Sequence, residues 1–218
     1  LVQGGSDVLL VDARSASKGI ASRFGATRRA TLLEVARQEK ALDEVVQPVY
    51  QGLGLVSLVR MRQDLGSLSV AETQRLGTSF DLLARQASVV MVDGELDTND
   101  AFPVSAMSDG QIVVQISRGA ASLKSAYSLL KRVNACLGRL SFGVLVTGAS
   151  EDEARLASEN MARKASRYLA IQLNSMGSGP ANEHRGRAAN LGRSVIDAFP
   201  LAGASVAFRR LAGQLSLS

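Results

Sequence analysis

Two short apolar runs, each ending in an aspartate, constrain the fold of this chain more than any other feature. Val8–Asp12 reads Val-Leu-Leu-Val-Asp, and Val89–Gly94 reads Val-Val-Met-Val-Asp-Gly. Runs that are rich in β-branched residues and do not alternate are typical of strands buried on both faces of a parallel sheet. Open α/β sheets bind ligands at the carboxyl ends of such strands. The two aspartates therefore predict a phosphate and magnesium site at one edge of a sheet.

Further apolar runs alternate with helical patterns along the rest of the chain. We expect strands at residues 8–12, 53–59, 88–93, 112–117, 142–147 and 169–173. We expect helices near residues 30–46, 70–86, 119–137, 151–168, 182–191 and 203–215, and a turn at 177–180. Strands separated by helices at this spacing indicate parallel β-α units. The sequence thus predicts one α/β domain over residues 1–218, with a mostly parallel sheet flanked by helices on both faces.

Composition limits the compartment and the partners that we expect for this protein. No stretch approaches the roughly 18 uninterrupted apolar residues of a membrane span, so no span is expected. We expect a cytoplasmic protein, or one that is peripheral to the inner membrane. The single cysteine, Cys136, excludes an internal disulfide and fits a reducing compartment; we interpret it as a buried packing residue. The net charge of +5 permits contact with nucleic acid or anionic lipid but requires neither.

Several familiar catalytic motifs are absent from these 218 residues, among them G-x-S-x-G, H-E-x-x-H, C-x-x-C and the P-loop G-x-x-x-x-G-K-[ST]. The one histidine, His184, lies in a polar stretch and is interpreted as a surface residue. The nearest phosphate candidate is the segment 14–19, with Arg14 and Lys18 as possible anion contacts. It lacks the first glycine and the hydroxyl after lysine, so an ordinary strand-to-helix connection is the preferred interpretation.

The order of these pieces resembles the MinD/ParA family of deviant-Walker P-loop ATPases, and within it the flagellar-number regulators of the FlhG (FleN) type. Val8–Asp12 is similar to the family's second strand and Val89–Gly94 to its Walker B strand. Three later segments also resemble family motifs: Ile112–Ser125, Phe142–Ser150 and Val195–Ser205. Residues 1–7 look like the end of the family's first helix. We therefore expect the N-terminal strand, the P-loop and most of that helix to be missing here.

The resemblance implies roles for individual residues. Asp12 takes the position near the magnesium and the attacking water, but Arg14 replaces the second aspartate of that motif. Asp93, followed by Gly94, takes the Walker B position, whose carboxylate holds magnesium through a water. Thr147 and Gly148 stand where the family has an asparagine that contacts adenine. The resemblance implies ATP or ADP with Mg²⁺ as the cofactor, or no cofactor if the site has decayed.

These substitutions favour a regulatory protein with a degenerate, non-hydrolysing nucleotide site that acts through protein contacts, with flagellar assembly or transcription regulators as partners. Two alternatives stay open. One is an active ATP-dependent switch that dimerises and has its P-loop upstream. The other is an accessory ATPase-like protein of cellulose secretion or pilus localisation.

The last helix could contact a partner or a membrane surface. Membrane-targeted relatives end in a basic amphipathic helix. This helix is short and contains Gly213, so packing against the sheet is the preferred interpretation. The residues concerned are Phe208, Arg209, Arg210, Leu211 and Leu215. The nearby arginines, Arg185, Arg187 and Arg193, lack interleaved aromatic residues, and nucleic acid is therefore not expected as a partner.

Overall fold

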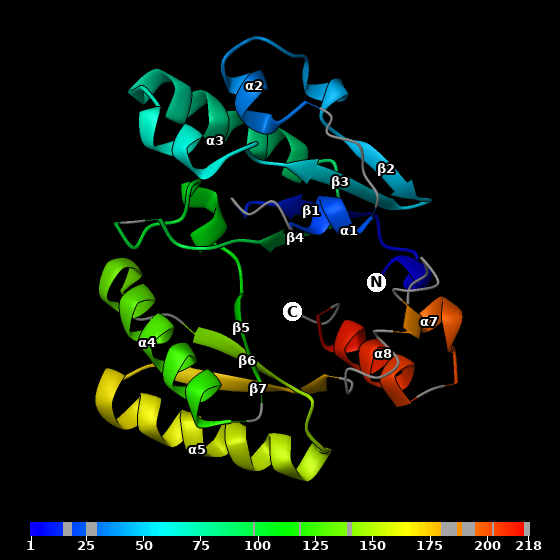
Figure 1. Ribbon diagram of the computed structural model, residues 1–218, viewed down its shortest axis with the longest axis vertical. Helices are drawn as coiled ribbons and strands as arrows, with labels where there is room; N and C mark the ends of the chain where they lie inside the picture. Colours follow the sequence, from blue (N-terminus) through cyan, green and yellow to red (C-terminus); the bar gives the residue numbers. More distant parts are fainter. Residues whose placement is uncertain are drawn as a thin grey trace. The chain divides into compact units, whose positions relative to one another are not determined.

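The computed structural model describes residues 1–14, 19–24, 30–97, 99–117, 119–138, 141–179, 187–188, 195–201 and 203–215. The chain divides into two compact units, Leu1–Gly110 and Gln111–Ser218. Each unit contains one sheet with helices packed on it (Figure 1). The predicted α/β class with mostly parallel strands is confirmed. That the two units make one domain stays a prediction.

The sheet of the first unit has the strand order β2-β3-β1-β4. Its strands are β1 Val8–Asp12, β2 Gln47–Tyr50, β3 Leu53–Ser57 and β4 Val89–Asp93. β1 pairs in parallel with both β3 and β4, so it is the strand enclosed on both sides. β2 is antiparallel to β3 and joined to it by a tight turn, in which Gly52 has φ +78°. That left-handed conformation favours glycine.

The helical segments of this unit lie between the strands. They are the 3-10 helices η1 Val2–Gly4, η2 Leu42–Glu44, η3 Arg62–Ser67 and η4 Ser105–Ser108, and the α-helices α1 Ile20–Arg23, α2 Leu32–Ala36 and α3 Val70–Ala84. Side chains of α2 and α3 form a buried core with those of β1 and the end of β3, including Leu32, Leu76, Phe80, Val11 and Leu58. Burial of this apolar surface supplies most of the driving force for folding the unit.

A polar network joins α2 to α3. Both helices begin with a capping box, Thr31 with Glu34 in α2 and Ser69 with Glu72 in α3. Arg37, at the end of α2, donates from Nε to Glu72 Oε1 at 3.0 Å. Arg75 of α3 donates from Nε to the carbonyl oxygen of Ala36 at 2.6 Å. Arg75 of α3 therefore satisfies the last carbonyl group of α2, and Arg37 pairs with the carboxylate of the α3 capping box.

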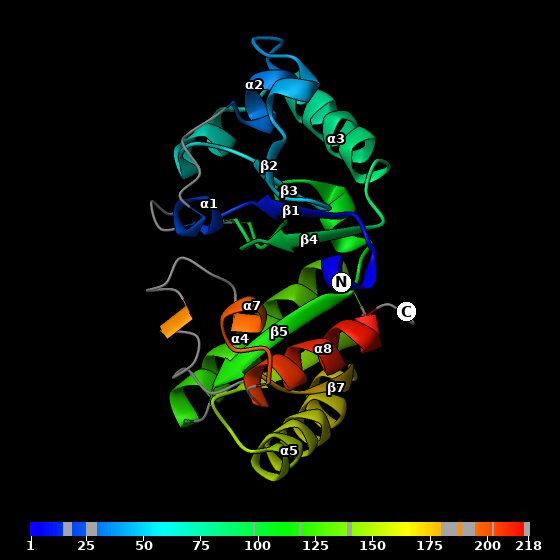
Figure 2. The ribbon, with the colours of Figure 1, turned by 90° about the vertical axis from the view of Figure 1, so that its right-hand side faces the viewer.

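The second unit has an all-parallel sheet in the order β5-β6-β7. Its strands are β5 Ile112–Ser117, β6 Ser141–Thr147 and β7 Gln172–Gly179, and its described helices are α4 Ala120–Leu137, α5 Glu151–Leu169, α7 Val195–Ala198 and α8 Gly203–Leu215. α4 packs on β5, α5 on β6 and β7, and α8 on β7 (Figure 2). Phe142 and Leu130 are fully buried in the core of this unit. Among the helices so described, none is both long and apolar enough to cross a membrane.

Several sequence expectations about local structure are wrong. The helix expected over 30–46 ends at Ala36, because the backbone turns left-handed at Gln38 (φ 65°). Residues Gln47–Tyr50, where no strand was expected, form the edge strand β2, which contains Pro48. The last strand begins at Gln172 and runs to Gly179, through most of the expected turn, because α5 continues to Leu169.

Two predictions about burial are also wrong. β4 is not buried on both faces, because it is the edge strand of its sheet, and Met91 and Val92 are 43% and 36% exposed. Cys136 is exposed on α4 rather than packed in the core. It belongs to the outward face of the helix, whereas the buried face carries Ala126, Leu130 and Val133.

Candidate functional site

The two strand-end aspartates lie side by side. β1 and β4 are parallel neighbours, and their register pairs Asp12 with Asp93. Both residues therefore stand at the carboxyl edge of the first unit's sheet, where α/β proteins bind ligands. Ser57 ends β3 on the other side of Asp12 in the same register.

Asp12 is held by the chain's own backbone. Its side chain is buried, with Oδ1 accepting a hydrogen bond from the amide of Arg14 at 3.3 Å and Oδ2 one from the amide of Ala21 at 3.1 Å. Gly19 packs directly on the carboxylate, and a β-carbon on that residue would lie 2.8 Å from Asp12 Cγ. The carboxylate thus fixes the beginning of α1 against the end of β1.

Asp93 lies beside a positive charge. Nη1 of Arg14 is 4.0 Å from Asp93 Oδ2, and both side chains are partly exposed. The Asp93 carbonyl oxygen accepts from the amide of Ala13 at 3.0 Å, which extends the β1–β4 pairing by one step. Arg14 therefore places a guanidinium next to the carboxylate that the resemblance assigns to magnesium.

The residues present here do not fit a bound magnesium ion in this arrangement. Magnesium requires nearly octahedral oxygen ligands at about 2.0–2.1 Å. Both oxygens of Asp12 already accept backbone hydrogen bonds, and Arg14 lies next to Asp93. Over the part of the chain that the structure describes, no group of three or more His, Cys, Asp or Glu side chains could hold a metal. That Asp93 holds Mg²⁺ stays a prediction that this geometry does not support.

The residues that follow Asp93 form an ordered acidic loop. Gly94 is exposed. Asp97 Oδ1 accepts from the amides of Asn99 at 2.7 Å and Ala101 at 2.9 Å, as in an Asx turn. The loop is therefore shaped by its own side chain. Lys18, the other anion candidate, lies outside the described residues.

The adenine candidates belong to the second unit. Thr147, the last residue of β6, donates from Oγ1 to the carbonyl oxygen of Ile116 at 3.1 Å. Gly148 follows with φ +70° and has open space where a side chain would stand. Neither residue has an amide side chain that could read a base edge, so a role in adenine binding stays a prediction.

The C-terminal candidates have partners within the second unit. Arg210 makes a 2.7 Å ion pair with Glu151 of α5, and Arg209 donates to the carbonyl oxygen of Pro200 at 3.0 Å. Phe208 packs in a small cluster with Ala188 and Phe199. Two further candidates are Leu211, which is half-buried, and Leu215, whose side chain is not described.

The basic residues near α8 give little support to a nucleic-acid surface. Arg187 lies over the ring of Phe199, with its guanidinium carbon 5.5 Å from the ring centroid. His184, Arg185 and Arg193 fall outside the described residues.

The chain was compared with family models and with known proteins. No family model matches the chain. The antiactivator FleN of Pseudomonas aeruginosa is 26% identical over 209 residues, which cover 95% of this chain and 75% of FleN. This chain is similar to FleN over almost its whole length.

Solved structures agree on the fold of this chain. The MinD protein of Pyrococcus horikoshii, complexed with Mg-ADP, has a TM-score of 0.70 at 14% identity, with 98% of this chain and 84% of MinD covered. MinD of Aquifex aeolicus, from a MinC:MinD complex, has a TM-score of 0.73 at 14% identity, with 99% and 86% covered. The MinD/ParA fold expected from the sequence is therefore confirmed.

The chain also has a feature that its sequence did not reveal, the close packing of Gly19 on Asp12. A glycine in the segment after a strand that ends in aspartate is the only signal that could have indicated it.

Proposed function

We propose that this protein is a regulator of flagellar assembly or number that acts through contacts with other proteins, and that its nucleotide site is degenerate. Support comes from the similarity to FleN over 95% of the chain, since that relative is named an antiactivator, a protein that opposes an activator. The MinD/ParA-like fold supports the same class of regulator. Flagellar assembly factors or transcription regulators are the partners that follow from this kinship.

The position of Arg14 carries the second part of the proposal. Phosphoryl transfer requires cations against the phosphates and a carboxylate free to hold the metal. Here the Arg14 guanidinium lies 4.0 Å from Asp93 Oδ2, and Asp12 binds backbone amides. A guanidinium beside Asp93 competes with a divalent cation for the same negative charge. Binding of Mg-ATP and its hydrolysis are both disfavoured.

A second proposal concerns the outer edge of strand β4. In the described residues β4 pairs only with β1, although its sequence is that of a central strand. The family resemblance implies a further parallel strand beside it. We propose that such a strand, together with the two units, makes one α/β domain. Slow amide exchange at Val90 and Val92 in the native protein would support this arrangement, and fast exchange would contradict it.

Nucleotide turnover separates the degenerate site from an active switch. The protein encoded by the whole gene, with any residues that precede Leu1, is incubated with Mg-ATP and phosphate release is followed, with Asp93→Asn measured in parallel. We expect both proteins to release phosphate at the background rate. Steady turnover by the natural chain that disappears in Asp93→Asn would show a working ATPase instead.

The regulatory part is tested in cells. Deletion of the gene should change the number of flagella per cell, as counted by electron microscopy. Because the site is proposed to act without hydrolysis, the Asp93→Asn protein should restore the normal number as well as the natural protein does. An unchanged count after deletion would exclude the flagellar role, and the accessory role in cellulose secretion or pilus localisation would then be examined.

A further inference from the structure

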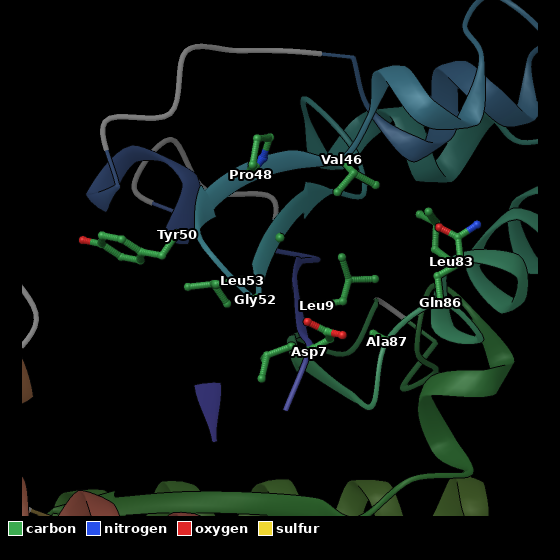
Figure 3. Close-up of a pocket in the computed structure, with 12 residues that line it drawn as sticks. Asp7, Leu9, Val46, Pro48, Tyr50, Gly52, Leu53, Leu83, Gln86 and Ala87 are labelled. Atoms are coloured by element: carbon green, nitrogen blue, oxygen red, sulfur yellow. The ribbon is translucent and has the colours of Figure 1, made fainter. Parts of the chain in front are cut away.

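A pocket opens at the end of the first unit's sheet that is opposite Asp12 and Asp93. It has a volume of about 290 Å³ and lies among the amino ends of β1 and β3, the strand β2 and the end of α3 (Figure 3). Asp7 at its wall is five residues before Asp12, which corresponds to about 16 Å along a strand. The pocket is therefore separate from the candidate nucleotide edge. Its volume is just below the range of about 300–1,000 Å³ typical of small-molecule sites.

The lining of the pocket is apolar except for a few polar groups. Its apolar wall is built mainly by Leu9, Val46, Leu53 and Leu83. The polar groups include the side chains of Asp7 and Gln86, both exposed to solvent. In Figure 3 these apolar side chains and the carboxylate of Asp7 gather around the ends of the strands, with Gln86 beside Leu83.

Asp7 has a fixed backbone and a carboxylate with no partner of its own. Its carbonyl oxygen accepts hydrogen bonds from the amides of Ser88 at 2.9 Å and Val89 at 3.1 Å. No described residue, however, lies within ion-pair or hydrogen-bond distance of the Asp7 carboxylate. A fixed negative charge at the wall of an apolar pocket is complementary to a ligand with an apolar stem and a cationic tip.

One exposed aromatic residue, Tyr50, lines the pocket. Tyr50 is 50% exposed and meets Phe24, which is 41% exposed, edge to face with ring centroids 6.5 Å apart. The chain has only six phenylalanines, three tyrosines and no tryptophan. One of these few aromatic residues therefore lines the pocket, and a second packs against it. Aromatic residues at a rim are typical of protein interfaces and attract cations through their ring faces.

We propose that this pocket receives a lysine or arginine side chain of a partner protein, with the aliphatic stem against Leu9 and Leu53 and the charged end near Asp7. The volume suits a single side chain better than a nucleotide-sized ligand, and the exposed aromatic rim suits a protein surface. That the side chain comes from a protein rests on the proposed regulatory function. The pocket and its charge preference do not depend on it.

The test uses purified chain and small probes. N-acetyl-lysine amide, N-acetyl-arginine amide and, as charge controls, hexylammonium, hexanol and hexanoate are titrated while the methyl NMR signals of Leu9, Val46, Leu53 and Leu83 are followed. We expect the three cations to shift these signals with dissociation constants on the order of millimolar, since one apolar contact and one exposed ion pair act alone. Hexanoate should bind more weakly than hexanol.

Variants assign the charge preference to named residues. Asp7→Asn should weaken cation binding about two- to fivefold, the range expected for an exposed ion pair. Gln86→Glu should strengthen it by up to about twofold, because it adds a second carboxylate to the wall. Asp43→Asn removes an exposed carboxylate elsewhere in the same unit and should leave binding unchanged. Thermal denaturation of each variant confirms that it is folded.

Each possible result decides the matter. No methyl shift with any probe, or equal binding of hexylammonium, hexanol and hexanoate, would overturn the proposal. Binding of hexylammonium without either amino-acid amide would overturn the assignment to a protein side chain. Since these measurements involve neither ATP nor flagella, a negative result leaves the proposed regulatory function to its own tests.

Discussion

Gly19 lies against the carboxylate of Asp12, so that a β-carbon on residue 19 would fall 2.8 Å from Asp12 Cγ. Oδ2 of Asp12 also accepts a hydrogen bond from the amide of Ala21, two residues after Gly19. A single buried carboxylate thus holds both the end of a strand and the beginning of the next helix. Backbone hydrogen bonds to Asp12 can therefore hold this carboxylate in place without a metal ion.

Gly19→Ala should destabilise the protein by about 1–3 kcal/mol, because the added methyl group displaces Asp12 and the amides that it binds. The free energy of unfolding is measured by urea denaturation. Gly77→Ala is the matched control, since a β-carbon there meets no atom within 4 Å. It lies inside α3 and should stabilise the protein by about 0.5–1 kcal/mol. Equal effects of the two substitutions would contradict the contact.

Asp12→Asn should also cost about 1–3 kcal/mol, because the new amide group cannot accept hydrogen bonds at both of its atoms. Arg14→Ala should cost no more than about 1 kcal/mol, since its guanidinium makes only a partly exposed 4.0 Å contact with Asp93. Urea denaturation of both variants gives the comparison. A larger loss for Arg14→Ala would mean that the ion pair, and not the backbone hydrogen bonds of Asp12, organises this edge.

The capping box of α3 should make stability depend on pH in acid. Hydrogen bonds from Ser69, and then the Arg37 guanidinium, lower the pKa of Glu72 from 4.5 to about 2. A carboxyl with a lowered pKa in the folded state stabilises the protein fully above pH 4.5, and this contribution is lost as the pH falls toward 2. Glu72→Gln should therefore reduce the loss of stability between pH 4.5 and 2 in acid titrations followed by circular dichroism.

Arg37→Met gives the control for this titration. It removes the ion pair but keeps the Ser69 hydrogen bonds, which are the larger cause of the lowered pKa of Glu72. This variant should therefore retain most of the pH dependence that Glu72→Gln removes. If Arg37→Met abolishes the dependence instead, the ion pair is the main cause.

When residues 1–218 are studied without the further strand proposed above, the apolar edge of β4 should promote self-association. An exposed, flat edge strand without lysine or proline offers unpaired backbone groups to a second chain. Met91→Lys places a charge on this strand and should shift the protein toward monomer in size-exclusion chromatography with light scattering. Val113→Lys tests the same idea on β5, an edge strand of the other sheet, where Val113 is 41% exposed. An unchanged mass over a range of concentrations would show that the edge is already covered.

The strands that the sequence predicted well are those with uninterrupted β-branched runs. β5 has the expected bounds, and β1 and β4 end at their aspartates as expected. The common edge of Asp12 and Asp93 also followed, because parallel strands place their carboxyl ends at one edge, but their pairing on neighbouring strands did not. The aspartates could be located from local pattern alone.

The errors come from features that have no local signal. α2 ends two residues before Gln38, and α5 ends one residue before Ala170. Both Gln38 and Ala170 have a left-handed backbone conformation. Neither residue type announces such a conformation, which glycine or asparagine usually marks. The second half of β7 is polar, so its sequence does not predict a strand. It is a strand because it pairs with β6. The contact of Arg14 with Asp93 depends on strand register and rotamer, which no spacing in the sequence encodes.

The reciprocal arginines of α2 and α3 have a consequence for motion. α2 has five residues, whereas isolated helices shorter than about 12–15 residues are marginal in water. The carbonyl oxygen of its last residue, Ala36, accepts from Arg75, and Arg37 binds Glu72 in the first turn of α3. Neither end can fray without releasing an arginine that the other helix uses. The two termini should therefore open as one event, with matching rates of amide hydrogen exchange.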